Sequence, residues 1–307
     1  MVELLSCVPL LIAIAFLTVA ERKLLAAHQL RLGPEELGVV QPFADALKLL
    51  IKETIIPARA NKVLYLVAPV LTLTLALIGW AVIPWGFGLV LADVQSAILY
   101  LMAISTLSIY GLLGAGWSSN STYALLGAMR ATAQMVSYEV AIGLIILAVV
   151  ITAGSLSLTQ IVKVQSAIWL LIPLFPAILM HITSILAETN RTPFDLPEGE
   201  SELVSGYNVE YSSITFALFF LGEYLHIMLM SYLFTLIFLG GWQYTLTSQL
   251  LGILVLTIKA VGIMAFFIWV RATLPRYRYD QLMHLLWKAY LPLTIPMLLL
   301  IPLLLPS

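Results

Sequence analysis

Residues 4–24 read LLSCVPLLIAIAFLTVAERKL, an apolar run that ends in three charged side chains at positions 21–23. A transmembrane helix needs about 20 mostly apolar residues, so this run is long enough to cross a bilayer. It is preceded by Glu3 rather than by a basic segment, and it ends in charges rather than at a small-residue cleavage site. The stretch is therefore expected to be a membrane span that the protein retains, not a signal peptide.

The whole chain has the composition of a membrane protein. Of its 307 residues, 61% are hydrophobic and only 10% are charged, which leaves too little charge to cover the surface of a soluble fold. The apolar runs predict eight transmembrane helices, near 4–24, 63–84, 94–114, 131–153, 166–188, 212–239, 250–270 and 289–306. We therefore expect an all-α membrane protein in which residues 1–307 form a single polytopic domain.

The basic residues indicate how the chain is oriented. Eight spans place both termini on one side of the membrane and divide the loops into two sets. The loops at 21–62, 115–130, 188–211 and 271–288 together hold 13 of the 15 Lys and Arg residues. By the positive-inside rule these loops face the cytoplasm or the mitochondrial matrix. The net charge of −1 provides no basic field for nucleic acid.

The chain offers few ligands for a cofactor. Cys7 is the only cysteine, which excludes an internal disulfide and an iron–sulfur cluster held by four cysteines of this chain. The four histidines do not recur at the spacing of a bis-histidine haem site. Glu223 and His226 could form half of a di-metal site, but such a site needs a second Glu-x-x-His motif, and the sequence has none. We therefore expect this chain by itself to bind no redox cofactor and no metal.

The first inner loop contains a short amphipathic segment, QPFADALKLLIKE, at 41–53. Pro42 suits the first turn of a helix. One face of that helix carries Phe43, Leu47, Leu50 and Ile51, and another carries Asp45, Lys48 and Lys52. A helix this short and two-faced is expected to lie in the membrane interface rather than to cross. It could seal the surface of the bundle, or it could form a lip around a lipid-side opening.

Ionisable side chains inside the spans are a strong functional signal. Glu139, Glu223 and Lys259 fall deep within predicted spans, and Glu188 lies at the inner end of one. A rise of 1.5 Å per residue places the first three about 12, 16 and 18 Å from the inner face. An ionisable group at such depth costs roughly 2.5–3.5 kcal/mol on insertion scales, so each needs a partner or a function. The four could form a ladder of proton carriers, or they could be satisfied by interhelical hydrogen bonds and ion pairs.

A second signal is the loop AETNRTPFDLPEGESELVSG at 187–206, which gathers five acids against the single base Arg191. Its prolines and glycines exclude a regular helix, and irregular backbone at membrane depth is tolerated only where protein or a watery cavity surrounds it. Clustered carboxylates raise one another's pKa and titrate as a group. We expect a functional loop whose protonation responds to a nearby reaction. The alternative, which is compatible with it, is a solvated acidic loop that docks a basic neighbour.

Five segments of the chain carry a resemblance to a known family. They are AERKLLAAHQLRLGP (20–34), QPFADALKLLIKE (41–53), MRATAQMVSYEVAIGL (129–144), AETNRTPFDLPEGESELVSGYNVEY (187–211) and RYRYDQLMHLLWK (276–288). In these segments the chain resembles subunit 1 of respiratory complex I, the NADH:ubiquinone oxidoreductase. The resemblance runs nearly from end to end, and the fourth and fifth segments are the most specific.

The resemblance implies a fold and a reaction. The family has eight transmembrane helices and forms much of the chamber in which ubiquinone is reduced by an iron–sulfur cluster of a hydrophilic neighbour. The quinone enters from the membrane near the first span and the interfacial helix, and a file of buried acids leads towards proton-pumping subunits. The chain is thus expected to act as a subunit of a proton-translocating NADH:ubiquinone reductase. FMN and the iron–sulfur clusters are expected in partner subunits, and membrane lipids surround the complex.

Family roles are carried over to those residues of this chain that match the family's motifs. The implied proton path comprises Glu139, Glu188, Glu223 and Lys259, with Tyr138 and Tyr224 beside two of the acids. The implied quinone-binding residues are Arg22, Arg31, Asp45, Lys48, Lys52, Arg191, Asp195, Glu198, Glu200 and Glu202. The implied docking residues for hydrophilic partner subunits are Arg271, Arg276 and Arg278.

Two other functions account for parts of the pattern. A free-standing ion transporter would explain the buried ionisable groups, but the sequence has no paired half-repeats. The membrane anchor of a membrane-bound hydrogenase would share the file of acids but needs no quinone. Retention of both FADALKLLIKE and RTPFDLPEGESELVSG favours the quinone enzyme. The compactness of the chain, with no extension at either end, favours a mitochondrially encoded copy in the mitochondrial inner membrane over a bacterial plasma membrane.

Overall fold

A computed structural model of the chain describes residues 2–34, 38–86, 88–166, 168–195, 206–243 and 249–304. These residues fold into helices joined by turns, and a bridge between Gly86 and Leu89 is the only β pairing among them. Six helical segments of this part of the chain are long and apolar enough to cross a membrane. The prediction of an all-helical membrane protein is therefore confirmed.

The six long segments follow one another through the chain. They are α3 (Lys62–Gly79) continued by η1 (Trp80–Val82), α4 (Ala97–Ser118), α5 (Thr122–Ala153), α9 (Ser213–Phe238), α10 (Gln249–Thr273), and a C-terminal run of α11 (Tyr279–His284), the π-helical turn η3 (Leu285–Tyr290) and α12 (Leu291–Leu304). Two further apolar helices are α1 (Val2–His28), with 27 residues, and α7 (Phe175–Glu188), with only 14. The shorter elements are α2 (Gln41–Ile51), α6 (Leu158–Val164) and η2 (Gly206–Asn208).

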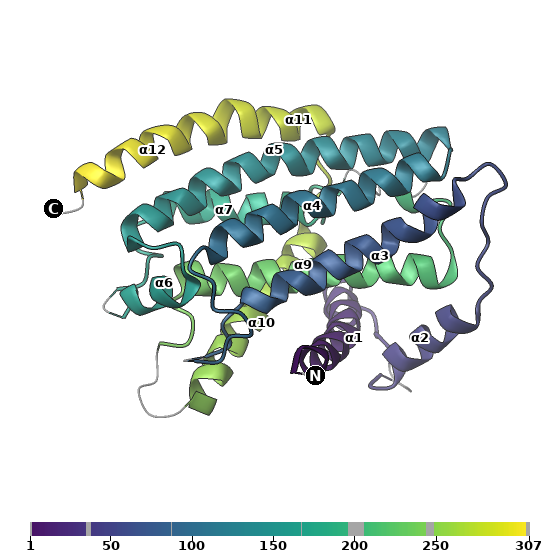
Figure 1. The fold of residues 1–307 in the computed structure, drawn as a ribbon, viewed down its shortest axis with the longest axis horizontal. Helices are drawn as coiled ribbons and strands as arrows, with labels where there is room; N and C mark the ends of the chain where they lie inside the picture. Colours follow the sequence, from purple (N-terminus) through teal and green to yellow (C-terminus); the bar gives the residue numbers. More distant parts are fainter. Residues whose placement is uncertain are drawn as a thin grey trace.

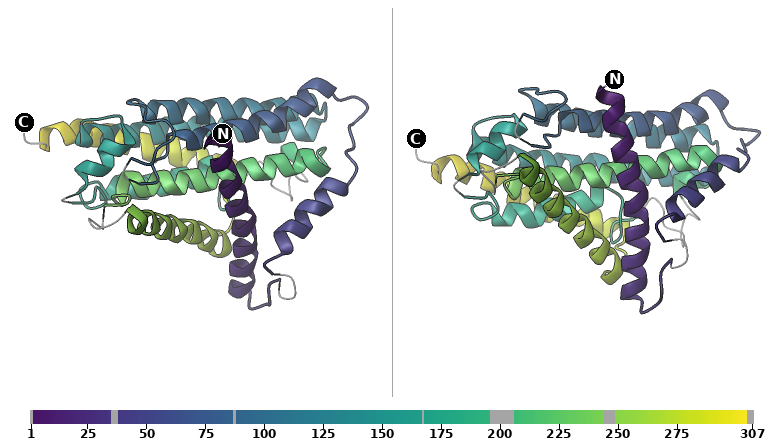
Figure 2. Two further views of the ribbon diagram at one scale, coloured as in Figure 1. Left: turned by 60° about the horizontal axis from the view of Figure 1, so that its bottom comes forward. Right: turned by 90° about the horizontal axis from the view of Figure 1, so that it is seen from below.

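The long helices form one layered bundle. Figure 1 shows α3, α4, α5 and α9 running in nearly the same direction, with α11 and α12 along the edge of α5. In this bundle α4 packs against both α3 and α5, while α9 packs against α3 and α10. Both views of Figure 2 show α1 standing steeply across the bundle, with α2 at its margin. This arrangement brings α9 into contact with α1, α3 and α10.

The boundaries of α5 follow from local chemistry. α5 begins at Thr122 rather than near 131, because the Ser121 hydroxyl accepts a hydrogen bond from the Ala124 N–H and caps the first turn. It ends at Gly154, whose φ of +68° is the left-handed conformation common just after a helix. The early start adds polar and basic side chains to the N-terminal end of the helix. Glu139 consequently lies near the middle of α5.

The span predicted at 166–188 is helical only in its second half. Pro173 has no backbone N–H and disfavours helix at the residue before it, so α7 begins only at Phe175, with Pro176 in its first turn. The loop predicted at 271–288, in contrast, is mostly helical. Because α10 continues to Thr273 and α11 begins at Tyr279, only residues 274–278 form the link.

The irregular segment before α7 is tied to the end of α9. The side-chain amide of Gln165 donates hydrogen bonds to the carbonyls of Leu236 and Ile237, each at 2.9 Å. The backbone N–H of Leu171 donates to the carbonyl of Phe238 at 3.2 Å. Carbonyls in the last turn of a helix have no partner within that helix, so the segment satisfies groups that α9 leaves open.

α2 forms within the segment predicted to be an amphipathic helix. Pro42 lies in its first turn and is buried, whereas the apolar side chains of Phe43, Leu47, Leu50 and Ile51 are exposed on the surface of this chain. Packing against the rest of the chain therefore covers little of the apolar face of α2.

Candidate functional site

Two of the deep acids line one cavity between the helices. It has a volume of about 80 Å³ and is bordered by α3, α4, α5, α9 and the end of α7. Its lining includes Glu188, Glu223, His226 and Ser105, together with many apolar side chains. A water molecule in a protein needs roughly 10–15 Å³ of space and two to four polar partners. The cavity is therefore large enough, and polar enough at these positions, for several waters.

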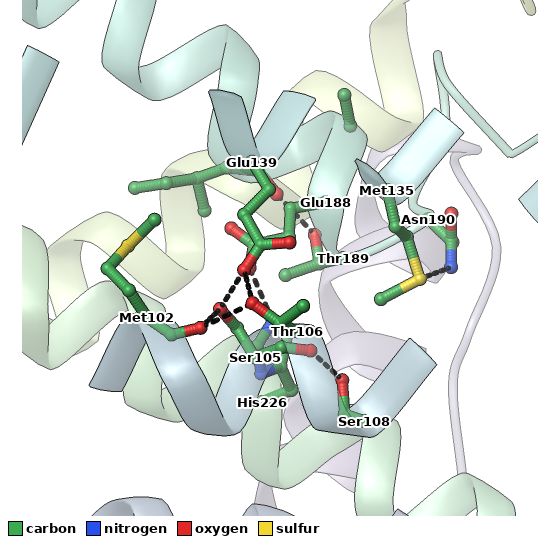
Figure 3. A network of polar contacts seen from close by, with 12 residues as sticks. Met102, Ser105, Thr106, Ser108, Met135, Glu139, Glu188, Thr189, Asn190 and His226 are labelled. Atoms are coloured by element: carbon green, nitrogen blue, oxygen red, sulfur yellow. Dashed lines mark hydrogen bonds and ion pairs between the residues drawn. The ribbon is translucent and has the colours of Figure 1, made fainter. Parts of the chain in front are cut away.

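Glu139 is held at the edge of this cavity by α4. Its carboxylate accepts hydrogen bonds from the hydroxyl groups of Ser105, at 2.9 Å, and of Thr106 (Figure 3). Ser105 also lines the cavity. Because a hydroxyl can both donate and accept, Ser105 offers a chemically competent link between Glu139 and the cavity.

Glu188 and His226 meet at the same cavity. His226 Nε2 on α9 lies 3.5 Å from Glu188 Oε1 at the end of α7 (Figure 3). The other carboxylate oxygen of Glu188, Oε2, is buried and has no hydrogen-bond partner among the described residues. A buried polar atom without a partner is unfavourable, and water in the cavity can supply the missing hydrogen bond.

Glu223 reaches the cavity from α9 and accepts a hydrogen bond from the hydroxyl of Tyr207 in η2. Two glycines allow η2 to approach α5 closely enough for this contact. A Cβ atom at Gly127 would lie 2.8 Å from the Cα of Gly206, and Gly206 has a φ of +59°. Tyr207 is absent from the residues expected at the site, because nothing in GYNVEY distinguishes a tyrosine that reaches an acid from one that packs in the core.

A second cluster forms around Glu21, where α1, α9 and α10 meet. The buried Glu21 carboxylate accepts hydrogen bonds from the guanidinium groups of Arg191, at 3.2 Å, and Arg271, and from the hydroxyl of Tyr224. The Arg191 guanidinium lies 4.5 Å from the centre of the Tyr224 ring. In the sequence, Glu21 stood out only as a charge at the end of the first span. The available signal for a buried role was an acid that directly follows a long apolar run.

The groups around Arg191 in the Glu21 cluster stabilise its positive charge. Burial opposes the charge of Arg191, but the nearby Tyr224 hydroxyl, Glu21 and Glu223 outweigh burial and raise the pKa of Arg191 above its usual range. Arg191 is therefore a permanent cation at this position. Because Tyr224 follows Glu223 directly on α9, the cluster adjoins the acids of the cavity.

Lys259 and Tyr138 lie away from the acids that they were expected to join. Lys259 Nζ donates to the backbone carbonyls of Leu239, at 2.7 Å, and Gly241, at 3.0 Å, and lies 4.6 Å from the centre of the Trp169 ring. These contacts place it at the C-terminal end of α9. The Tyr138 hydroxyl donates to the carbonyl of Leu282 in α11, at 3.1 Å. The structure therefore brings Glu188 and Glu223 to one cavity, with Glu139 hydrogen-bonded to Ser105 in its wall, but it does not bring Lys259 there.

Apart from Arg191, the residues expected on the quinone side fall into four groups. Arg22 and Asp45 form an exposed ion pair of 2.7 Å, which joins α1 to α2. Arg31, Lys48 and Lys52 are exposed along the same loop. Asp195 accepts a hydrogen bond from Arg276 at 3.2 Å. Glu198, Glu200 and Glu202 lie outside the described residues.

The three arginines expected to dock partners have different environments. Arg271 is paired with Glu21 inside the bundle, and Arg276 is paired with Asp195. Arg278 is exposed in the link between α10 and α11, where its backbone N–H donates to the side chain of Gln281 at 3.3 Å.

Comparisons with known proteins agree with the resemblance. A family model described as NADH dehydrogenase matches residues 2–302. The NADH-ubiquinone oxidoreductase chain 1 of Metridium senile is 55% identical over 302 residues, which cover 97% of this chain and 90% of that protein. The corresponding protein of Arabidopsis thaliana is 55% identical over 294 residues, covering 94% and 90%. A bacterial relative, from the NADH-quinone oxidoreductase of Paramagnetospirillum magneticum, is 54% identical over 293 residues, covering 94% and 86%. The resemblance stated from five sequence segments is thereby confirmed, and the chain belongs to the NADH dehydrogenase family.

Proposed function

We propose that this chain is the core membrane subunit of a proton-translocating NADH:quinone oxidoreductase, in which it forms part of the quinone chamber and the start of a buried proton path. Relatives that are 54–55% identical over nearly the whole chain carry the names of such subunits. The single observation that carries the coupling role is the cavity lined by Glu188 and Glu223, with Glu139 one hydrogen bond away through Ser105. FMN and the iron–sulfur clusters of the reaction belong to partner subunits.

The chamber lies on the inner side of this chain, around the loop that follows α7. Arg191 and Asp195 contribute the described part of that loop, and the acids at 198, 200 and 202 continue it. Arg22, Arg31, Asp45, Lys48 and Lys52 line the approach along the first loop. The ion pairs that hold Arg191 and Asp195 in place give the chamber a fixed set of charges before the quinone arrives.

The proton path begins beside the chamber and runs into the cavity. Reduction of a quinone to a quinol takes up two protons, which changes the charge near the headgroup. Glu223, whose charge interacts with that of Arg191 beside the chamber, responds to this change. Water in the cavity then connects Glu223 with the Glu188–His226 pair and, through Ser105, with Glu139. Intramembrane carboxylates with polar partners around water are the usual components of such relays.

The chain crosses the membrane eight times. The six long segments supply six crossings, and α1, which extends about 40 Å, supplies another. α7 extends only about 21 Å, which is less than the roughly 30 Å of hydrocarbon. The described residues between α6 and α7 complete this crossing, because the side chain of Gln165 and the backbone N–H of Leu171 are paired with the end of α9.

α2 lies in the membrane interface at the quinone opening. Its exposed apolar face suits the acyl boundary, and Lys48 and Lys52 on another face suit the headgroups. The exposed Arg278 and the loop after α7 contact the hydrophilic partner subunits. The membrane is the mitochondrial inner membrane, with a bacterial plasma membrane as the alternative, since relatives of both eukaryotes and bacteria match at similar identity.

The test is the Glu188→Gln variant in membranes that contain the assembled complex. Quinone reduction and proton pumping should fall together by about tenfold or more, because a proton-transfer group contributes at least this much. NADH oxidation by an artificial acceptor should be unchanged, since it bypasses this chain. Glu53→Gln, which changes an exposed acid, provides the matched control. Normal quinone reduction and normal pumping by the Glu188→Gln complex would show that Glu188 is structural.

A further inference from the structure

Polar contacts, rather than apolar packing, fix the position of α2. Pro42 is buried, but the apolar side chains along the rest of the helix are exposed. At its N-terminal half α2 is joined to α1 by the Arg22–Asp45 pair, whose side chains are 52% and 37% exposed. Exposed ion pairs contribute little to stability. The contacts at the other end of α2 therefore decide how firmly the helix is held.

The C-terminal end of α2 is bound by the residues that start α9. The Ser213 hydroxyl lies within hydrogen-bond distance of two carbonyl oxygens, that of Leu49 at 2.9 Å and that of Lys52 at 2.5 Å. The hydroxyl of Ser212 accepts a hydrogen bond from the backbone N–H of Ile55 at 3.1 Å. The two carbonyls lie at the end of α2, where a helix leaves its acceptors unsatisfied. Ser213 is only 1% exposed, so water does not compete for this contact.

Ser213 makes this contact in an unfavourable backbone conformation. Its φ of +62° lies in the left-handed region, which residues with a Cβ atom rarely adopt. Such conformations persist where the surroundings hold them, and they concentrate at functional sites. Here the Tyr211 ring stacks on Tyr65 with centroids 4.2 Å apart, and the Tyr65 hydroxyl donates to the carbonyl of Glu210 at 2.7 Å. Residues 210–213 thus form a fixed base against α3.

We propose that Ser213 is a positioning residue, whose hydroxyl sets the angle of α2 against α9 and thereby the width of the opening through which quinone enters from the lipid. The inference rests on the proposed function, which places α2 at that opening. Ser213 touches no reacting atom. Its loss is expected to change access of the substrate, not the chemistry that follows.

The test compares five variants in the assembled complex in membranes, with ubiquinone as the substrate. Ser213→Ala removes the hydroxyl and keeps the Cβ atom, whereas Ser213→Gly removes the hydroxyl and also relieves the left-handed strain. Both should raise KM for ubiquinone about five- to tenfold, the effect of losing one or two hydrogen bonds, while kcat stays unchanged. Ser213→Asn tolerates the left-handed conformation and supplies N–H donors, so it should restore most of the wild-type KM. Ser231→Ala is the matched control, because that buried hydroxyl bonds only a carbonyl of its own helix among the described residues.

An unchanged KM in Ser213→Ala and Ser213→Gly overturns the inference. Failure of Ser213→Asn to restore KM also overturns it. So does a fall in the rate of quinone reduction that is fully explained by a smaller amount of assembled complex. Ser212→Ala, which removes only the acceptor of the Ile55 N–H, is a milder second variant and should raise KM by a smaller factor. The rate with an artificial electron acceptor measures the amount of assembled complex. If the wild-type complex oxidises NADH with that acceptor but reduces no quinone, the proposed function itself fails, which separates the two outcomes.

Discussion

Neutralising Glu21 should destabilise the contact between α1, α9 and α10 and lower the rate of quinone reduction. The wild-type cluster holds one carboxylate against two guanidinium groups, so these three side chains sum to a charge of +1. Glu21→Gln keeps the shape of the side chain but raises that sum to +2. Arg191 and Arg271 then repel each other with no acid between them.

The cost can be bounded from the exposure of the three side chains. Removing one partner of a buried ion pair costs about 3–5 kcal/mol, whereas an exposed pair contributes about 0–1 kcal/mol. The Arg191 side chain is 15% exposed and the Arg271 side chain is 33% exposed, so the pair with Arg191 dominates. Glu21→Gln should therefore destabilise the native arrangement of the cluster by about 2–4 kcal/mol. This changes the equilibrium between the native and a displaced arrangement by a factor of roughly 30 to 900.

The assay is ubiquinone reduction per assembled complex, normalised by NADH oxidation with an artificial acceptor. Glu21→Gln should lower quinone reduction at least about tenfold, because Arg191 no longer has a fixed position over Tyr224. The double variant Glu21→Gln/Arg271→Gln returns the charge of the cluster to +1 and should recover part of the loss. Arg271→Gln alone is the single-variant reference that completes the cycle.

Two results would refute this reasoning. One is normal quinone reduction by Glu21→Gln in a fully assembled complex. The other is a double variant in which the two single effects simply add, because additivity would mean that Glu21 and Arg271 are not coupled.

Two further predictions concern the packing around the site. Gly127→Ala should push η2 away from α5 and lower quinone reduction, because its Cβ would lie 2.8 Å from the Cα of Gly206. Overpacking of this kind destabilises the local structure by about 1–3 kcal/mol. Gly143→Ala is the control and should leave the rate unchanged, since its Cβ would meet its nearest neighbour at an ordinary 3.6 Å. Lys259→Met should lower the thermal inactivation temperature of the complex while activity per assembled complex is kept. The variant removes hydrogen bonds from a charged donor, which contribute about 1.5–3 kcal/mol to stability. A loss of pumping in a stable Lys259→Met complex would instead make Lys259 a proton carrier.

The membrane class of the fold was readable from the sequence because hydrophobic length is a local property. Long apolar runs give helices, and some of these helices contain a proline, as at Pro9 and Pro69. Five of the six long segments begin within a few residues of the start of a predicted span or contain it entirely. The span at 166–188 shows the limit. Pro173 could be seen in the sequence, but the partner that lets an irregular segment replace a helix there is α9, which lies far along the chain.

The site was predicted in part, because a sequence gives depth along a helix but not the direction in which a side chain points. Depth placed Glu139, Glu223 and Lys259 in one ladder. Glu223 lines the cavity and Glu139 contacts its wall through Ser105, but Lys259 turns towards the end of α9. Glu21 and Tyr207 were missed for the same reason. Their contacts join residues that are distant in sequence or lie on separate elements, and no periodic pattern records such pairings.

The pairing between residues 165–174 and the end of α9 has a consequence for how the protein is made. The ribosome synthesises residue 165 about seventy positions before the carbonyls of Leu236 and Ile237 that its side chain will bind. Until α9 exists, the backbone N–H of Leu171 and part of the side-chain amide of Gln165 lack the partners that they have in the folded chain, and hydrocarbon offers none. We therefore expect the residues before α7 to reach their final position only after α9 has been made.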